Sequence, residues 1–271
     1  TRCYGKFSGF YALFAFPAQH KDELEKYIEE TAKTGTLSRY TFSWTTNLCE
    51  VAPDFEWFDF ERKSWDFPWK QWTEEVQSAS EKLPANLRDP KAYTVMADET
   101  DVLLLKELEK DGASKFADLA KVAKITPQGV RYRYYRHVVK RDLITDYQIA
   151  HFPYPLQVSD MCSFVIDFVN EAALAKFANT LRNKPFTITY GKMLEKNSLL
   201  LHTYTPKTEF SNFIESLNRL AEKDVVKNYF YVTLDLLAFK RQTMSYEFFK
   251  DNNWVYASRE KLEKLRKIAG V

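Results

Sequence analysis

The sequence predicts an α+β protein in which a helical unit separates two modules that share one order of elements. Three observations lead to this prediction. Short apolar or alternating runs, typical of strands, occur near the start of the chain and again after residue 160. Segments with apolar residues at three- and four-residue spacing, typical of amphipathic helices, follow these runs at similar intervals. The stretch from Asp98 to about Ile144 carries helical patterns only.

The first module, residues 1–82, has the pattern strand, helix, two strands, helix. The run FYALFAF predicts a buried strand that ends before Pro17, and KDELEKYIEETAKTG predicts a helix that stops at Gly35. The segments TLSRYTFSW and FEWFDFERKSW predict two further strands. A helix in PWKQWTEEVQSA, with Pro68 in its first turn, completes the module.

The second module, residues 156–240, repeats this pattern and adds a final strand. It comprises SFVIDFV, a helix capped by Asn170, the hairpin FTITYGKML and SLLLHTYT, a long amphipathic helix and KNYFYVTLDLLAF. This βαββαβ order is that of ferredoxin-like domains. We therefore expect two ferredoxin-like copies in one chain. Each sheet leaves one apolar face open, so we expect the copies to cover one another, face to face or through shared strands at their edges.

Three further segments complete the organisation of the chain. Residues 83–97, with Pro84 and Pro90, predict a linker, and residues 241–271 predict an extension that ends in a short helix capped by Ser258. The aromatic stretch FEWFDFERKSWDFPWKQW has two readings. It either packs in the core or between modules, or it forms a surface for a protein partner.

Composition excludes several classes of function. The chain has 271 residues, 45% of them hydrophobic, and a net charge of +2, which predicts a soluble globular protein with more than one domain. Only 7 glycines are present, and none is clustered as phosphate-binding loops require. The histidines lack the spacing of metal ligands. We therefore expect no enzyme activity, no cofactor and no metal.

The cysteines and the absence of an apolar run of membrane-spanning length indicate a compartment. Cys3, Cys49 and Cys162 are far apart and odd in number, which favours free thiols in a reducing cytoplasm. No window reaches the ~18 apolar residues of a membrane span, so we expect no membrane partner. The chain starts at Thr1, without Met, and we expect it to be either a fragment of a longer protein or a processed one.

The segment 98–150 predicts a helix-turn-helix. Asp98 is a suitable N-cap for a first helix, and SKFADLAKVAKI predicts a second. After a tight turn, Thr126 caps a third helix over 126–141, with Pro127 at its first position. Two short helices joined in this way, after a preceding helix, are typical of DNA-binding units. The following LITDYQIAHF predicts one strand of a wing.

The spacing of residues in the third helix divides it into two faces. Val130, Tyr134 and Val138 recur every four residues and should pack on the first two helices. The opposite side carries side chains that can read bases or bind phosphates. We expect Arg133 to bind DNA or to pair with an acid such as Asp101 or Asp118, and His137 to pack. The predicted DNA-binding residues are Thr126, Gln128, Gly129, Arg131, Tyr132, Tyr135, Arg136, Lys140 and Arg141.

These residues are similar to a known family. The run DETDVLLLKELEKDGASKFADLAKVAKITPQGVRYRYYRHVVKRDLITDY resembles the winged helix of Lrp/AsnC (feast/famine) transcription regulators. Residues 163–236 resemble the family's ligand-sensing RAM domain, which has a ferredoxin-like fold. The resemblance covers about half the chain. It implies a regulator that binds duplex DNA and dimerises through its sheets, either within one chain as a pseudo-dimer or as a homodimer.

The resemblance also bears on effectors and partners. It points to Gly191 as an effector-binding residue, although KMLEKN follows, without the aspartate usual in the family. It implies a further winged helix before Thr1. Some archaeal chains resemble this tandem arrangement, and some archaeal regulators recruit transcription factor B. The alternative function is therefore a protein-interaction module of the transcription machinery, in which the helix-turn-helix contacts protein rather than DNA.

Overall fold

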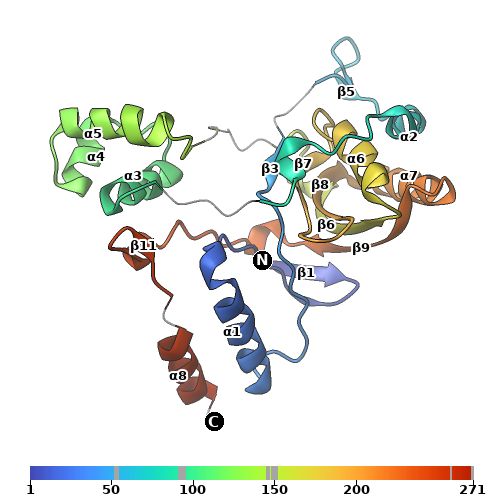
Figure 1. Cartoon of the computed structure of the whole chain (residues 1–271). Helices are drawn as coiled ribbons and strands as arrows, with labels where there is room; N and C mark the ends of the chain where they lie inside the picture. The colour runs from blue at the N-terminus through green and yellow to red at the C-terminus, as the bar shows by residue number, and fades with distance from the viewer. Residues whose placement is uncertain (52–54, 91–95, 145–146, 148–151, 257, 270–271) are drawn as a thin grey trace. The chain divides into compact units, whose positions relative to one another are not determined.

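The chain divides into two compact units in the computed structural model, which describes residues 1–51, 55–90, 96–144, 147, 152–256 and 258–269. We call Thr1–Ala12, Ser43–Lys91 and Ile149–Lys240 the sheet unit. We call Leu13–Phe42, Ala92–Gln148 and Arg241–Val271 the helical unit. Both combine segments that are far apart in the sequence (Figure 1).

A seven-stranded antiparallel sheet forms the centre of the sheet unit, in the order β2-β1-β9-β6-β8-β7-β3. Its bounds are β1 Arg2–Gly5, β2 Gly9–Phe10, β3 Cys49–Glu50, β6 Ser159–Phe168, β7 Thr187–Lys192, β8 Ser198–Pro206 and β9 Val226–Leu234. The helices are α2 Trp69–Ser78, α6 Glu171–Thr180 and α7 Phe210–Glu222, and a small hairpin pairs β4 Phe58–Asp59 with β5 Ser64–Trp65. From β6 to β9 the order is βαββαβ, and the predicted α+β class is confirmed.

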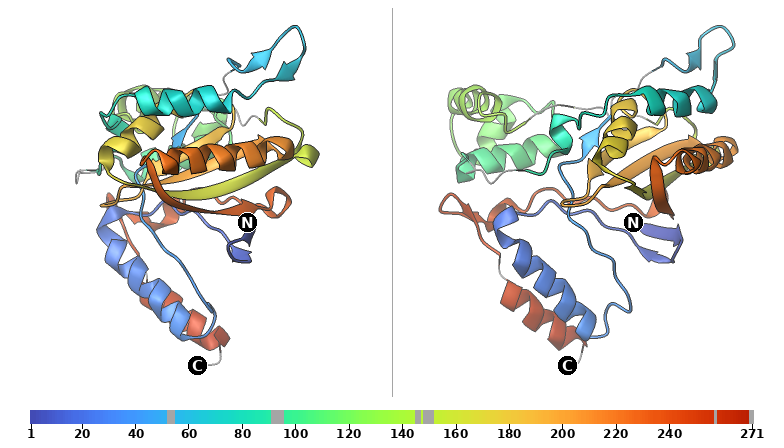
Figure 2. Two further views of the ribbon diagram at one scale, coloured as in Figure 1. Left: turned by 90° about the vertical axis from the view of Figure 1, so that its right-hand side faces the viewer. Right: turned by 45° about the vertical axis from the view of Figure 1, so that its right-hand side comes forward.

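All three helices pack on one face of this sheet (Figure 2). Strands β6 and β8 turn alternate residues, among them Phe164, Ile166 and Leu201, into this core. Asn170 caps α6 as predicted, since its side chain accepts a hydrogen bond of 2.8 Å from the backbone N–H of Ala173. Trp72 of α2 is fully buried here and donates to Thr180 Oγ1 at 3.1 Å.

Segments of the same chain pack on the opposite face of the sheet. Phe7 and Tyr11 cover Val232 and Leu234 of β9. Phe152 and Tyr154 pack against Tyr204 of β8, with ring centroids 5.2 and 5.8 Å away. Because these segments lie over it, apolar side chains of this face are buried without a second domain.

His202 of β8 lies on this covered face and is 2% exposed. Its Nε2 lies 2.7 Å from Tyr11 Oη and its Nδ1 lies 2.6 Å from Thr189 Oγ1. A neutral imidazole satisfies both hydroxyls, because it donates at one nitrogen and accepts at the other. Burial lowers the pKa of His202 to about 4, so the ring is neutral at pH 7.

The predicted first ferredoxin-like copy, residues 1–82, is wrong. In the described part of this segment, β1 and β2 extend one edge of the single large sheet and β3 extends the other. Of the expected strand over 10–16 only Phe10 is in a strand, as the end of β2, and the expected strand over 36–44 is not formed. Helix α1 (Lys21–Lys33) belongs to the helical unit. The physical reason is that Trp57, Trp69 and Trp72, three of the five tryptophans in this segment, complete the core of the one sheet and are not available for a second core.

The expected pairing of two ferredoxin-like copies is therefore wrong as well. The first 82 residues instead contribute the edge strands of the single sheet, helix α2 on one of its faces and segments that help to cover the opposite face. The core-packing reading of the aromatic stretch is confirmed for its tryptophans at 57, 69 and 72, and the partner-surface reading stays a prediction. Its three tryptophans named above are buried, whereas Phe55 and Phe60 near the β4–β5 hairpin are exposed.

The helical unit contains three consecutive helices, α3 Glu99–Lys110, α4 Phe116–Ala123 and α5 Pro127–Arg133. A π-helical segment, Tyr134–Val139, continues α5 without a break. Lys124, at a φ of 54°, makes the turn between α4 and α5. Of the predicted wing strand over 143–152, residues 145–146 and 148–151 lie outside the described residues, and the remaining four form no strand.

Residues from both ends of the chain complete the helical unit. The hairpin of β10 (Phe249–Lys250) and β11 (Asn253–Trp254) packs Phe249 against Val102 of α3. Helix α1 lies beside α8 (Ser258–Ala269), and Arg266 pairs with Glu30 at 3.3 Å (Figure 2). The predicted extension 241–271 is thus part of this unit rather than a separate tail. No helix within the described ranges is long and apolar enough to cross a membrane.

Candidate nucleic-acid interface

The third helix begins as the sequence predicts. The side chain of Thr126 accepts a hydrogen bond of 3.1 Å from the backbone N–H of Gly129, and Pro127 occupies the first helical position. Pro127 lacks an N–H that would otherwise be unpaired there, and its fixed φ suits a helix start. The cap therefore defines where the helix, and the row of side chains that it carries, begins.

The inward side of this helix packs as predicted. Val130 and Val138 are fully buried, and the ring of Tyr134 lies 5.4 Å from that of Phe116 on α4. The π-helical hydrogen bond from the N–H of Lys140 to the carbonyl of Tyr135 widens the last turns. Such segments are rare and often occur at functional sites.

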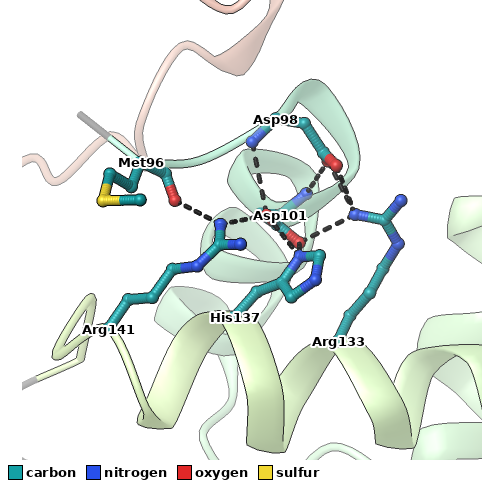
Figure 3. A network of polar contacts seen from close by, with 6 residues as sticks. All are labelled: Met96, Asp98, Asp101, Arg133, His137 and Arg141. Carbon is teal, nitrogen blue, oxygen red and sulfur yellow. Dashed lines mark hydrogen bonds and ion pairs between the residues drawn. The ribbon is translucent and has the colours of Figure 1, made fainter. Parts of the chain in front are cut away.

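A buried carboxylate, Asp101, anchors the inward side to α3 (Figure 3). Its side chain is 0% exposed. Arg133 Nη1 donates to Asp101 Oδ1 at 2.9 Å and to Asp98 Oδ2 at 2.6 Å. His137 Nδ1 lies 2.9 Å from Asp101 Oδ2, and Arg141 Nη1 lies 3.8 Å from the same oxygen. Arg133, His137 and Arg141 thus meet one acidic pair at successive four-residue steps.

The same two aspartates also start α3. Asp101 N–H donates to Asp98 Oδ1 at 3.0 Å, and Asp98 N–H donates to Asp101 Oδ2 at 3.3 Å, which forms a reciprocal capping box. The predicted N-cap at Asp98 is confirmed. Burial alone would raise the pKa of Asp98, but the hydrogen bonds and charge of Arg133, together with hydrogen bonds from the backbone N–H groups of Asp101 and Thr100, outweigh it and the pKa is lowered. This network fixes the third helix on the first by charge as well as by packing.

Asp98, Asp101 and His137 also lie close enough together to hold a metal ion. The guanidinium of Arg133 already lies within hydrogen-bonding distance of both carboxylates. The positive charge of this guanidinium takes the place that a metal cation would need. The three residues therefore belong to an ion-pair network, and we propose no metal there.

The outward side of the third helix consists of exposed polar, cationic and aromatic side chains. Arg131, Arg136 and Lys140 are exposed, and no ion pair to them is seen within the described residues. Tyr132 is 62% exposed, and Lys124 of the preceding turn adds an exposed cation. Of the other predicted DNA-binding residues, Thr126, Gln128 and Tyr135 are exposed and Gly129 is half-buried.

Two predicted contact residues have other roles in the structure. Arg141, expected at a phosphate, donates to the carbonyl of Met96 at 2.5 Å and faces Asp101 (Figure 3). Thr126 uses its hydroxyl in the helix cap. Of the acids considered for Arg133, Asp101 is confirmed, whereas Asp118 pairs with Lys121.

Sequence reasoning missed the network as a whole. Its signal was present in the three-residue step from Asp98 to Asp101 and in the four-residue steps from Arg133 to His137 to Arg141. Because an inward row of cations needs acids on the helix that it faces, the acidic start of the first helix could have identified Asp98 as a partner.

Gly191, the expected effector-binding residue, is covered by the chain itself. A Cβ atom at this position would lie 2.9 Å from Leu48 Cδ2 and 3.3 Å from the carbonyl oxygen of Thr46. The backbone of the same segment bonds to β7 and beyond, from Thr46 N–H to Lys192 and from Leu194 N–H to Trp44. The close approach that requires glycine is therefore made by a covering segment, and we propose no effector at Gly191.

No protein-family model and no curated protein matches the chain. Among solved structures, the chain is similar to the transcriptional regulator NMB0573 of Neisseria meningitidis in complex with L-Met, with 16% identity and a TM-score of 0.46 over 55% of this chain and 96% of that one. It is also similar to AsnC of E. coli, with 16% identity and a TM-score of 0.40 over 55% and 98%. A third is PF0864 of Pyrococcus furiosus, a member of the AsnC family, with 17% identity and a TM-score of 0.40 over 54% and 92%. Likenesses this weak support no argument about function, so the proposals below rest on this chain's own residues.

Proposed function

We propose that the protein is a DNA-binding transcription regulator, and that the outward side of the third helix lies in the major groove of duplex DNA. The observation that supports this most directly is the division of the helix. Arg133 and His137 are committed to the buried carboxylate, while Arg131, Arg136 and Lys140 are exposed without an acid on the same helix. In a nearly neutral protein, a helix face that only contacts water would not be expected to carry three cations and no acid.

The exposed side chains suit different parts of a duplex. Gln128 and Arg131 lie near the start of the helix, the end that enters the groove in helix-turn-helix proteins, and both can make two hydrogen bonds to one base edge. Arg136 and Lys140 lie further along, where cations bind phosphates and set the orientation of the helix. Gln128 and Arg131 therefore select sequence in this proposal, and Arg136 and Lys140 supply affinity.

The inward network has a positioning role in this proposal. A base contact requires the helix to be held with little freedom, because displaced donors lose their hydrogen-bond geometry. The pair of Arg133 with Asp98 and Asp101, together with the buried Val130 and Val138, holds the helix in this way. Arg133 is thus a positioning residue rather than a contact residue.

The test is binding of the whole chain to duplex DNA by fluorescence anisotropy. We expect binding to random-sequence duplex at low salt and tighter binding to fragments selected from a genomic library. The Arg131→Ala variant should retain binding to random duplex and lose the preference for the selected fragments. Absence of binding to either duplex at low salt would contradict the proposal.

A protein partner is the second candidate for the same surface. Val122 of α4 and Tyr132, Tyr135 and Val139 of the third helix are exposed, and apolar and aromatic side chains are typical of protein interfaces. If this reading is right, Tyr132→Ala and Tyr135→Ala abolish capture of a basal transcription factor, and binding to duplex stays weak and independent of sequence.

A further inference from the structure

Besides the three-helix segment, the helical unit contains two amphipathic helices that lie side by side, α1 and α8, which we call the α1–α8 pair. Both helices carry apolar residues at helical spacing, in α1 Leu24, Tyr27 and Ile28 and in α8 Leu262 and Leu265. All five are only half-buried. In α6 of the sheet unit, by contrast, Leu174 and Phe177 are fully buried. The α1–α8 pair therefore has an incomplete core.

Two helices of this length do not complete a core by themselves. Helices of 13 and 12 residues are each about 20 Å long, and isolated helices of this size are marginal in water. The apolar side chains of the two helices keep exposed surface although the helices lie side by side. Burial of that surface against two further helices would give the four-helix arrangement that such stripes form in many proteins.

The charges of the α1–α8 pair indicate which occupant fits. Helix α1 carries five acidic and three basic residues, whereas α8 carries five basic and two acidic ones. A two-fold interface uses the same surface on both copies, so this surface must be complementary to itself. One acidic and one basic helix side by side meet that requirement, because each helix of one copy can face the opposite helix of the other.

The two faces of the sheet are covered, and the sheet unit keeps its most exposed large apolar side chains, such as Phe10, Leu237 and Phe239, outside the helices that pack on the sheet. The helix-free face of the sheet buries His202, Val232 and Leu234 under segments of the same chain, and both edges of the sheet end in added strands. We infer that a second copy of this chain docks on the α1–α8 pair, with α1 of each copy against α8 of the other, to form a four-helix bundle.

The hairpin β10–β11 connects this bundle to the three-helix segment. His20, just before α1, has its Nε2 2.8 Å from the carbonyl oxygen of Trp254, and Gln19 donates to Asn253 at 2.7 Å. On its other side, Asp251 N–H donates to Glu99 of α3 at 3.1 Å. A dimer formed through the bundle therefore relates two third helices by the same two-fold axis. If these helices bind DNA as proposed above, two half-sites follow.

Sedimentation equilibrium of the whole chain, without DNA, tests the dimer independently of its function. An interface of two short helices lies at the small end of stable interfaces, so we expect a reversible dimer of twice 31.9 kDa with a micromolar dissociation constant. A chain that stays monomeric up to about 200 µM would overturn the proposal.

A double variant locates the interface. We expect Leu262→Ala with Leu265→Ala to weaken the dimer about 100-fold, which corresponds to about 2.7 kcal/mol. The control is Leu237→Ala, on a leucine of the sheet unit that is 91% exposed, which should leave the dissociation constant unchanged. A double variant that dimerises like the wild type would show that the interface lies elsewhere.

Because the double variant also weakens contacts within the pair, a measurement on the unaltered chain is needed. Equal amounts of 14N- and 15N-labelled protein are mixed and treated with a zero-length carbodiimide, which joins carboxylates to lysines. We expect peptides that join α1 to α8 with mixed isotopes, because Glu29 and Lys264 are among the exposed groups there. Cross-links of a single isotope only, at a concentration where the dimer is present, would overturn the arrangement.

Discussion

The two units of this chain differ in how completely they use their own surfaces. The sheet unit covers both faces of its sheet and extends both edges with segments of its own chain. Most of the apolar side chains of its βαββαβ part that point toward the helices are buried. The helical unit exposes a row of cations on its third helix and leaves the apolar stripes of α1 and α8 half-buried. We therefore call the sheet unit the closed unit, because the chain covers both faces of its sheet, and the helical unit the open unit, because it leaves charged and apolar surfaces exposed.

This difference teaches where to look for partners. A surface that the chain covers itself, such as the one over Gly191 or His202, is stabilised by internal contacts and offers little to a ligand. A surface that carries uncompensated charge or half-buried apolar residues costs free energy unless a partner uses it. Changes in the closed unit should thus alter stability alone, and changes in the open unit should alter binding.

The largest effect is expected at Arg133, which stabilises the helical unit and also positions the side chains proposed to bind DNA. Arg133→Ala leaves Asp101 buried with His137 as its nearest remaining side-chain partner, and the loss of one member of a buried pair costs about 3 kcal/mol or more. Amide hydrogen exchange on α3 and α5 measures the loss as a lower free energy of local opening. The matched control Arg131→Ala should stay within about 0.5 kcal/mol of the wild type. Equal exchange in both variants would mean that the network does not hold the helix.

Acidification should act on the two units in different pH ranges. His202 has a pKa of about 4 in the folded chain and 6.5 as a free side chain, so the unfolded chain binds the extra proton. Stability of the sheet unit should therefore fall by up to about 3 kcal/mol as pH drops from 6.5 to 4. The lowered pKa of Asp98 works at lower pH, because its stabilisation is present above the ordinary carboxyl pKa and is lost only below it.

Exchange rates on β8 and on α3, measured between pH 7 and pH 4, separate these contributions. The variant His202→Gln should remove most of the dependence on β8 in the upper range and leave α3 unchanged. A sheet unit whose stability is flat between pH 6.5 and pH 4 would contradict the burial of a neutral His202.

The sequence allowed the second βαββαβ segment and the three helices to be predicted because their signals are local. Asp98, Thr126 and Asn170 are caps, and the apolar spacing of Val130 and Val138 is a property of one helix. The role of the first 82 residues could not be predicted in this way. The alternation of apolar and polar residues in a strand is the same whether the strand starts a new sheet or joins the edge of an existing one. What decides between the two is the burial of Trp57, Trp69 and Trp72 in the core of the single sheet.

The roles of the cations in the third helix were only partly predictable for the same reason. Spacing separated Arg131 from Val130, but it could not show that Arg141 would donate to Met96 rather than to a phosphate. That contact depends on a residue 45 positions earlier in the chain. Long-range partners of charged residues leave no periodic signal.

A smaller effect is expected at the predicted base-reading residue. Arg131→Ala should weaken binding to the best duplex by about 1–3 kcal/mol and leave binding to random duplex nearly unchanged. Competition between the two duplexes in an anisotropy experiment gives the ratio directly. Equal losses on both duplexes would reassign Arg131 from base reading to phosphate binding.

The smallest effect is expected in the closed unit. Gly191→Ala places a methyl group against Leu48 and should cost the sheet unit about 1 kcal/mol, because the end of the leucine side chain can shift. Affinity for DNA should not change. A reduced affinity in this variant would show that the segment over Gly191 takes part in binding.

The salt dependence of binding to random duplex tests the central claim, DNA binding by the outward side of the third helix, most directly. If Lys124, Arg136 and Lys140 contact phosphates, the logarithm of the binding constant for random duplex should fall with the logarithm of salt concentration at a slope of about −3. The double variant Arg136→Ala with Lys140→Ala should reduce the magnitude of the slope by about 2. A slope that is the same in the wild type and the double variant, or binding that salt does not weaken, would contradict the claim.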